Sequence, residues 1–122
     1  MPERVRALRG AITVDDDTKE QVLDRTSHLL REMMARNGIS NEDVVSIILT
    51  ATEDITSEFP AAAGRSMGLV QIPVIGAREI AVAGGMSRCI RVLMHFYTDR
   101  AAADLRHVFL EDAQTLPTDL PR

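Results

Sequence analysis

The hydrophobic and polar positions of the first forty residues follow the pattern of a strand and then of a helix. Residues 5–14 are rich in strand-forming side chains at both ends and predict an opening strand. Thr18 and Gln21 have the spacing of a capping box, and apolar side chains then recur at helical intervals. Asn37 and Gly38 form a helix stop signal. The pattern therefore predicts an amphipathic helix between Thr18 and Gly38.

Beyond residue 43 the pattern predicts mainly strands. Apolar or β-branched runs predict strands over residues 44–50, 70–75, 79–82, 89–97 and 107–110. A second helix is expected over residues 56–67, and Gly84 and Gly85 are expected to turn the chain. Pro73 places its strand at an edge or a bulge. The last residues, 117–122, contain two prolines and are expected to form a flexible tail.

This order of elements predicts one domain that spans residues 1–122. Its expected fold class is α+β (α/β), with a mixed sheet of about five strands and two main helices on one face. Nothing in the sequence supports a linker or a second domain. The opposite face of the sheet would be left uncovered, so we expect the chain to form an oligomer.

Composition and charge narrow the classes of partner. The net charge is −4, and the aromatic residues are one tyrosine and three phenylalanines, which argues against a nucleic-acid-binding surface. No apolar run approaches the roughly 20 residues of a membrane span, and no secretory signal is recognisable. A single cysteine, Cys89, permits no internal disulfide. We therefore expect a cytoplasmic protein that binds neither nucleic acid nor membrane.

Charged side chains interrupt the apolar strands at three positions. Arg91 lies in the strand 89–97, Arg9 in the strand 5–14, and Glu79 in a third apolar segment. A buried guanidinium needs a carboxylate partner or an anionic ligand, because an unpaired buried charge is strongly destabilising. These residues suggest an anion pocket. A surface position on a half-exposed strand explains Arg91 equally well, and an ion pair with Glu79 or another acid explains Arg9 equally well. The three histidines lack metal-ligand spacing, so no metal site is expected.

Five groups of residues, in order along the chain, carry a resemblance to a known family. They are 6–14 (RALRGAITV), 50–54 with 59–61 (TATED and FPA), 78–80 (REI), 85–92 (GMSRCIRV) and 106–111 (RHVFLE). Over nearly its full length the chain resembles the monofunctional chorismate mutases of the trimeric α/β class, the AroH class. The resemblance implies a homotrimer with a pseudo-barrel arrangement and active sites between subunits. It also implies conversion of chorismate to prephenate, in phenylalanine and tyrosine biosynthesis, without metal or cofactor.

The resemblance also assigns roles to residues. Arg91 corresponds to the arginine that contacts the breaking ether oxygen, Arg9 to one that holds the compact substrate conformer, and Glu79 to a carboxylate that contacts the ring hydroxyl. These three are the expected catalytic residues, and Phe59 and Arg65 would come from the neighbouring subunit. The whole expected substrate-binding set is Arg9, Phe59, Arg65, Ile75, Gly76, Glu79, Arg91, Phe109 and Leu116.

The chain departs from the family pattern at some of these positions. Phe109 replaces a usual tyrosine, so one polar contact to the substrate is expected to be missing. Ala62 replaces a frequent lysine and removes a charge from the rim of the site. Ile75 and Gly76 replace a Thr-Cys pair found in some members. We expect these changes to affect affinity more than reaction type, because the three catalytic positions match.

Two other functions are considered beside the mutase. The first is a Rid-like imine deaminase, which also binds a carboxylate with an arginine at a trimer interface. The second is a non-catalytic trimeric module that binds small carboxylates. In that module Arg9, Glu79 and Arg91 would pair with one another instead of lining an open cleft.

Overall fold

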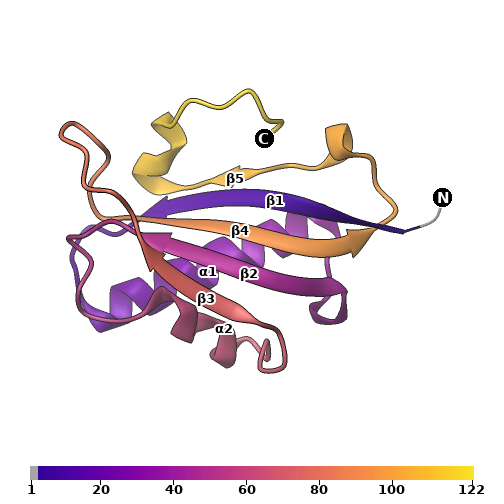
Figure 1. Cartoon of the computed structure of the whole chain (residues 1–122), viewed down its shortest axis with the longest axis horizontal. Coiled ribbons are helices and arrows are strands. Elements are labelled where there is room, and N and C mark those ends of the chain that lie inside the picture. Colours follow the sequence, from indigo (N-terminus) through magenta and orange to yellow (C-terminus); the bar gives the residue numbers. More distant parts are fainter. Residues whose placement is uncertain (1–2) are drawn as a thin grey trace.

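A five-stranded mixed sheet forms the centre of the computed structural model, which describes residues 3–122. The strands lie in the order β3-β2-β4-β1-β5 (Figure 1). β4 is antiparallel to both of its neighbours, whereas the β2–β3 and β1–β5 pairs are parallel. The strands are β1 (Arg4–Thr13), β2 (Val44–Ala51), β3 (Val74–Arg78), β4 (Cys89–Thr98) and β5 (Val108–Phe109). The α+β class and the mixed sheet predicted from the sequence are confirmed.

Within residues 3–122, two α-helices and three 3-10 turns connect the strands, and a fourth 3-10 turn follows β5. The helices are α1 (Lys19–Asn37) and α2 (Ala63–Ser66), and the turns are η1 (Asn41–Asp43), η2 (Pro60–Ala62), η3 (Ala102–Asp104) and η4 (Glu111–Thr115). Thr18 caps α1 by accepting a hydrogen bond from the Gln21 N–H at 3.1 Å. Gly38 ends the helix in the left-handed region, at φ 62°. Within residues 3–122 no helix combines the length and the apolar character that crossing a bilayer requires.

The second helix is shorter than the sequence predicted. Residues 56–59 are not helical, and the regular part is the short 3-10 turn η2 followed by the four residues of α2. Asp17 explains the difference, because its carboxylate accepts hydrogen bonds from the backbone N–H groups of Thr56 and Ser57. Pro60 then occupies the first position of η2, where its missing N–H is harmless.

Two of the predicted strands also differ. The strand expected over 70–75 begins only at Val74, because Pro73 has no N–H to donate and residues 70–72 form a turn. The carbonyl of Pro73 accepts a hydrogen bond from the Ile47 N–H, and β3 is an edge strand, as the proline predicted. Residues 79–82 form no strand; they begin a loop that extends beyond the sheet and returns to β4 (Figure 1).

The hydrophobic core lies between α1 and one face of the sheet. Strand residues on this face pack against the apolar stripe of α1; they include Leu8, Ile12, Ile47, Leu49, Ile90, Val92, Met94 and Phe96, facing Val22, Leu29, Leu30 and Met33. Gly10 allows the close approach of α1, since a Cβ built there would stand 2.5 Å from the Met33 sulfur. Alternation along each strand sends the remaining side chains to the other face.

The other face of the sheet stays open in the single chain. Val5, Ile48, Ile75 and Tyr97 are exposed on it, Ile75 by 65%. Arg9 and Arg91 belong to the same face, because Arg9 pairs in register with Leu93, two residues from Arg91 on β4. The sequence predicted an uncovered face, and the structure has one.

Candidate functional site

Arg91 lies where β4 passes between β1 and β2, with Ala11 and Thr50 as its partners in register. Its strand neighbours Ile90 and Val92 are buried in the core, so Arg91 points to the open face. The side chain is 31% exposed, and its Nε is 3.6 Å from Oε2 of Glu79. The charge in the apolar strand therefore faces a carboxylate that is close enough for charge attraction but not for a hydrogen bond.

Glu79 reaches Arg91 from the first residue after β3. Its backbone N–H donates to the Ala51 carbonyl at 2.9 Å, which extends the β2–β3 ladder by one bond. The Thr50 hydroxyl donates to Oε2 of Glu79 at 2.5 Å. The Glu79 side chain is only 18% exposed, so the carboxylate is held by a hydroxyl and faces a guanidinium at the border of the sheet.

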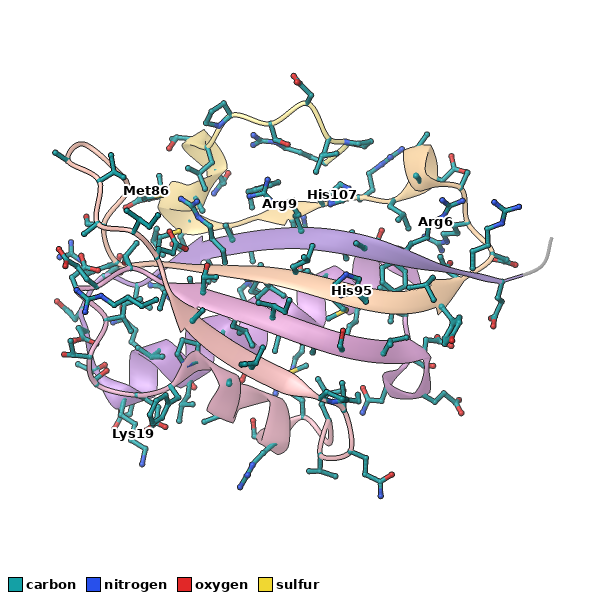
Figure 2. All side chains as sticks on the ribbon, viewed as in Figure 1. Arg6, Arg9, Lys19, Met86, His95 and His107 are labelled. Carbon is teal, nitrogen blue, oxygen red and sulfur yellow. The ribbon has the colours of Figure 1, made fainter. Side chains whose placement is uncertain are left out.

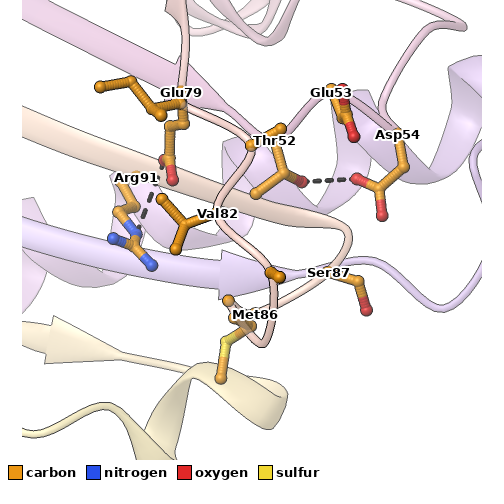
Figure 3. A pocket seen from close by; sticks show the side chains of 12 residues that line it. Thr52, Glu53, Asp54, Glu79, Val82, Met86, Ser87 and Arg91 are labelled. Carbon is orange, nitrogen blue, oxygen red and sulfur yellow. Dashed lines mark hydrogen bonds and ion pairs between the residues drawn. The ribbon is translucent and has the colours of Figure 1, made fainter.

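Arg91 and Glu79 line a cavity of about 470 Å³, which we call the Arg91 cavity. Figure 3 shows the two side chains facing each other, with Val82 and Met86 of the 79–88 loop close by. Its lining residues are Thr52, Glu53, Asp54, Glu79, Ile80, Ala81, Val82, Ala83, Gly85, Met86, Ser87 and Arg91. The cavity therefore combines one cation, several carboxylates and apolar loop side chains.

Asp54 fixes the end of the loop that closes this cavity. Its carboxylate accepts the Thr52 hydroxyl at 2.6 Å, and both of its oxygens lie within 3.0 Å of the Arg88 backbone nitrogen. Arg88 has φ 47°, an unusual value for a residue with a side chain. The Asp54 contacts hold this strained residue one position before β4 and thus fix the approach to Arg91.

Arg9 lies on the same sheet face but does not line the Arg91 cavity. Its backbone N–H donates to Nδ1 of His107 at 2.9 Å, and the two residues lie side by side in Figure 2. Burial and the positive charge of Arg9 hold the pKa of His107 below its usual value. The Arg9–Glu79 ion pair considered from the sequence is wrong: within residues 3–122 the cation that faces Glu79 is Arg91, 3.6 Å away.

Phe109 of β5 and Leu116 lie in a small second cluster beside β1, the neighbour of the Arg91 strand. Phe109 is buried against Ala11 and Cys89, and Leu116 packs on the same cluster. Burial raises the pKa of the Cys89 thiol, which favours its neutral, weakly nucleophilic form. The Arg122 guanidinium stands 4.7 Å from the centre of the Phe109 ring. The chain end thus covers this edge of the open face.

Phe59, Arg65, Ile75 and Gly76 lie apart from the Arg91 cavity. Phe59 is 79% exposed and borders two further cavities. It shares one of about 740 Å³ with Ile75 and Gly76, and the other, of about 390 Å³, with Arg65. Within a single chain, Arg91 and Glu79 border one cavity, and Phe59 and Arg65 border another. Neither cavity contains both pairs.

Two features of the site were not predicted from the sequence. The contacts of Thr50 with Glu79 and of Asp54 with Arg88 depend on strand register and loop return, which no local pattern reveals. The segment 50–54 did signal the family, but no role was assigned to its side chains. Within residues 3–122, no three side chains of the metal-ligating types converge on one point.

Comparison with known proteins identifies the family of this chain. The sequence profile of the family described as chorismate mutase type I matches residues 5–120. The chain belongs to this family. It is therefore an enzyme of the isomerase class that acts on a small molecule, and the resemblance drawn from the sequence is confirmed.

Individual members of the family match the mutase chain along most of its length. Chorismate mutase AroH of Thermus thermophilus is 46% identical over 117 residues, which are 95% of this chain and 96% of that protein. Chorismate mutase AroH of Bacillus subtilis (strain 168) is 42% identical over 117 residues, 95% and 92% of the two chains. The solved chorismate mutase from Clostridium thermocellum Cth-682 matches with a TM-score of 0.89 at 42% identity, over 91% of this chain and 99% of that one.

Proposed function

We propose that this mutase converts chorismate to prephenate by electrostatic catalysis, with Arg91 as the principal catalytic group. The observation that carries the proposal is the position of its guanidinium, which borders the Arg91 cavity opposite Glu79. Chorismate carries two carboxylates, and arginine is suited to bind them because its donors match carboxylate geometry. Arg9 and Glu79 are proposed to bind the substrate beside Arg91.

The reaction is an intramolecular rearrangement in which one C–O bond breaks while one C–C bond forms. Negative charge develops on the ether oxygen as the C–O bond lengthens. A fixed guanidinium beside that oxygen stabilises the transition state more than the ground state, and such a difference raises the rate. Arg9 would favour the compact conformer in which the reacting carbons approach each other. The chain itself then needs to transfer no proton and form no covalent bond.

We further propose that the site is completed by a second copy of the chain in a homotrimer. Phe59 and Arg65 border a cavity that contains neither Arg91 nor Glu79, and Phe59 is 79% exposed. Exposed Ile48 and Ile75 lie on the open face of the sheet, which offers apolar surface for contact between copies. Arg65 of one copy would supply a cation to the Arg91 cavity of the next.

Chorismate turnover by the purified protein, without any added cofactor, tests the proposed activity. We expect Arg91→Ala to lower kcat by about 10²-fold or more, since it removes the charge aimed at the ether oxygen, and Arg91→Lys to retain part of the rate. Arg31→Ala is a matched control, because Arg31 is an exposed arginine on α1 far from the cavity. Near wild-type kcat in Arg91→Ala would refute the mechanism, and absence of prephenate from the wild-type reaction would refute the function.

A further inference from the structure

One oxygen of Glu79 faces two different donors. Oε2 accepts the Thr50 hydroxyl at 2.5 Å, whereas the Arg91 Nε stays 3.6 Å away, outside hydrogen-bonding distance. Within residues 3–122 that Nε is buried and has no hydrogen-bond partner. The carboxylate is thus bound by a neutral hydroxyl in preference to a neighbouring cation.

Other arginine–glutamate pairs within residues 3–122 stay open only where a competing contact is present. Arg25 stands 3.7 Å from Glu111, and its guanidinium donates to the Thr13 carbonyl and to Asp15. The guanidinium of Arg78 lies 2.8 Å from Glu53, and that of Arg36 lies 2.8 Å from Glu32. Both of those pairs are more exposed than Arg91 and Glu79, yet they close fully. Charge attraction strengthens as water is excluded, so the more buried pair should be the shorter one unless another contact opposes it.

The backbone identifies Thr50 as the opposing contact. Thr50 is the partner of Arg91 in register on β2, so its side chain stands next to Arg91 on the same face. The Ala51 carbonyl holds the Glu79 N–H at 2.9 Å, which fixes the Glu79 backbone one position further along β2. The hydroxyl therefore occupies Oε2 on the Thr50 side, and Nε of Arg91 is left without a hydrogen-bond partner among the described residues.

We propose that Thr50 is a positioning residue that keeps Glu79 from forming a closed ion pair with Arg91. A closed pair would act as an internal competitor, because an anionic substrate would have to displace Glu79 before it reached the guanidinium. With Thr50 in place, an anionic substrate can bind the Arg91 guanidinium without first displacing Glu79. This inference rests on the proposed function of Arg91 as a substrate-binding cation.

Three variants of Thr50 test the inference by steady-state kinetics with chorismate. Thr50→Val keeps the shape of the side chain but removes the donor, and we expect KM to rise about tenfold while kcat changes less than threefold. Thr50→Ala also removes the hydroxyl, but it puts no methyl group in its place. It should therefore raise KM by the same factor as Thr50→Val. Thr50→Ser retains the hydroxyl and should restore KM to near the wild-type value. If the substitutions only unfolded part of the protein, less active enzyme would be present. The apparent kcat would then fall, and KM would stay unchanged.

A double-mutant cycle with Glu79→Gln locates the effect. A neutral amide forms no ion pair with Arg91, so Thr50→Val should leave KM within twofold in the Glu79→Gln background. A tenfold rise in that background would overturn the inference, as would wild-type KM in both Thr50→Val and Thr50→Ala. Absence of turnover in the wild-type protein would instead overturn the proposed function, and the role of Thr50 with it.

Discussion

Phe109 is buried and lacks the hydroxyl of the tyrosine that is usual at this position in the family. Its ring contacts Ala11 and Cys89, which are close neighbours of Arg91 on the sheet. The Arg122 guanidinium lies over the ring at 4.7 Å, within the range of a cation–π contact. We propose that a hydroxyl added to this ring would reach the substrate of the proposed site beside Arg91.

We expect Phe109→Tyr to lower KM for chorismate about three- to tenfold with little change in kcat. The added hydroxyl would donate a hydrogen bond to the anionic substrate before and during the reaction, so it would improve binding of both states. Steady-state kinetics measure the effect, with Phe109→Leu as a variant that changes packing without adding a donor. An unchanged KM would mean that the hydroxyl does not reach the substrate.

Sequence reasoning selected the charged residues of the site but not the residues that orient them. Arg91 and Glu79 stand out because each interrupts an apolar segment, and the structure places them 3.6 Å apart. Thr50 gives no such signal, because threonine is ordinary in a strand. Its contact with Glu79 follows from the pairing of β2 with both β3 and β4, which joins residues far apart in the chain.

One carboxylate, that of Asp17, holds residues 56 and 57 in the segment between β2 and α2. Asp17 accepts the backbone N–H and the hydroxyl of both Thr56 and Ser57. These hydrogen bonds lower the pKa of Asp17 from 3.8 to about 2, with the side chain of Ser57 as the largest cause. Asp17 thereby holds the loop that leads to Phe59.

We expect Asp17→Ala to lower the free energy of unfolding at pH 7 by roughly 1–2 kcal/mol, because the loop loses its hydrogen-bond acceptor. The lowered pKa means that the carboxylate stabilises the fold fully above pH 3.8 and progressively less as the pH falls toward about 2. Urea unfolding at pH 7 and at acid pH measures the difference, which should shrink as the pH falls. Asp16→Ala, an exposed neighbour, is the control and should cost almost nothing.

The pattern of hydrophobic residues predicted long elements better than short ones. α1 has a capped start, a glycine stop and a continuous apolar stripe, so local signals agree along its length. The predicted helix over 56–67 had no such agreement, and contacts with Asp17 override helical propensity in its first residues. β3 was placed too early because Pro73 was counted within the strand that it precedes.

The whole molecule carries the two proposed halves of an active site on different parts of its surface. Arg91 and Glu79 border one cavity, and Phe59 and Arg65 border another. A site built between copies would need Arg91 from one chain and Arg65 from the next. A chain that lacks Arg91 and a chain that lacks Arg65 would then form one intact site wherever the second chain supplies Arg91 and the first supplies Arg65.

We expect co-expressed Arg91→Ala and Arg65→Ala chains to regain activity that neither variant has alone. With random mixing, about one site in four would combine an intact Arg91 with an intact Arg65, which predicts about a quarter of wild-type activity. Chorismate turnover of the mixed protein measures this, and native mass spectrometry counts the chains in each particle. Activity no higher than that of the separate variants would show that each chain completes its own site.

The central position of β4 sets the order in which a newly made chain can fold. β4 pairs along its length with β1, which leaves the ribosome about 80 residues earlier, and with β2 on its other side. Until β4 emerges, the β2–β3 pair is the longest ladder that the nascent chain can form, and the apolar edges of β1 and β2 stay unpaired. Such long-range pairing slows folding and prolongs exposure to aggregation, so synthesis of this small enzyme should depend on protection of its first 88 residues.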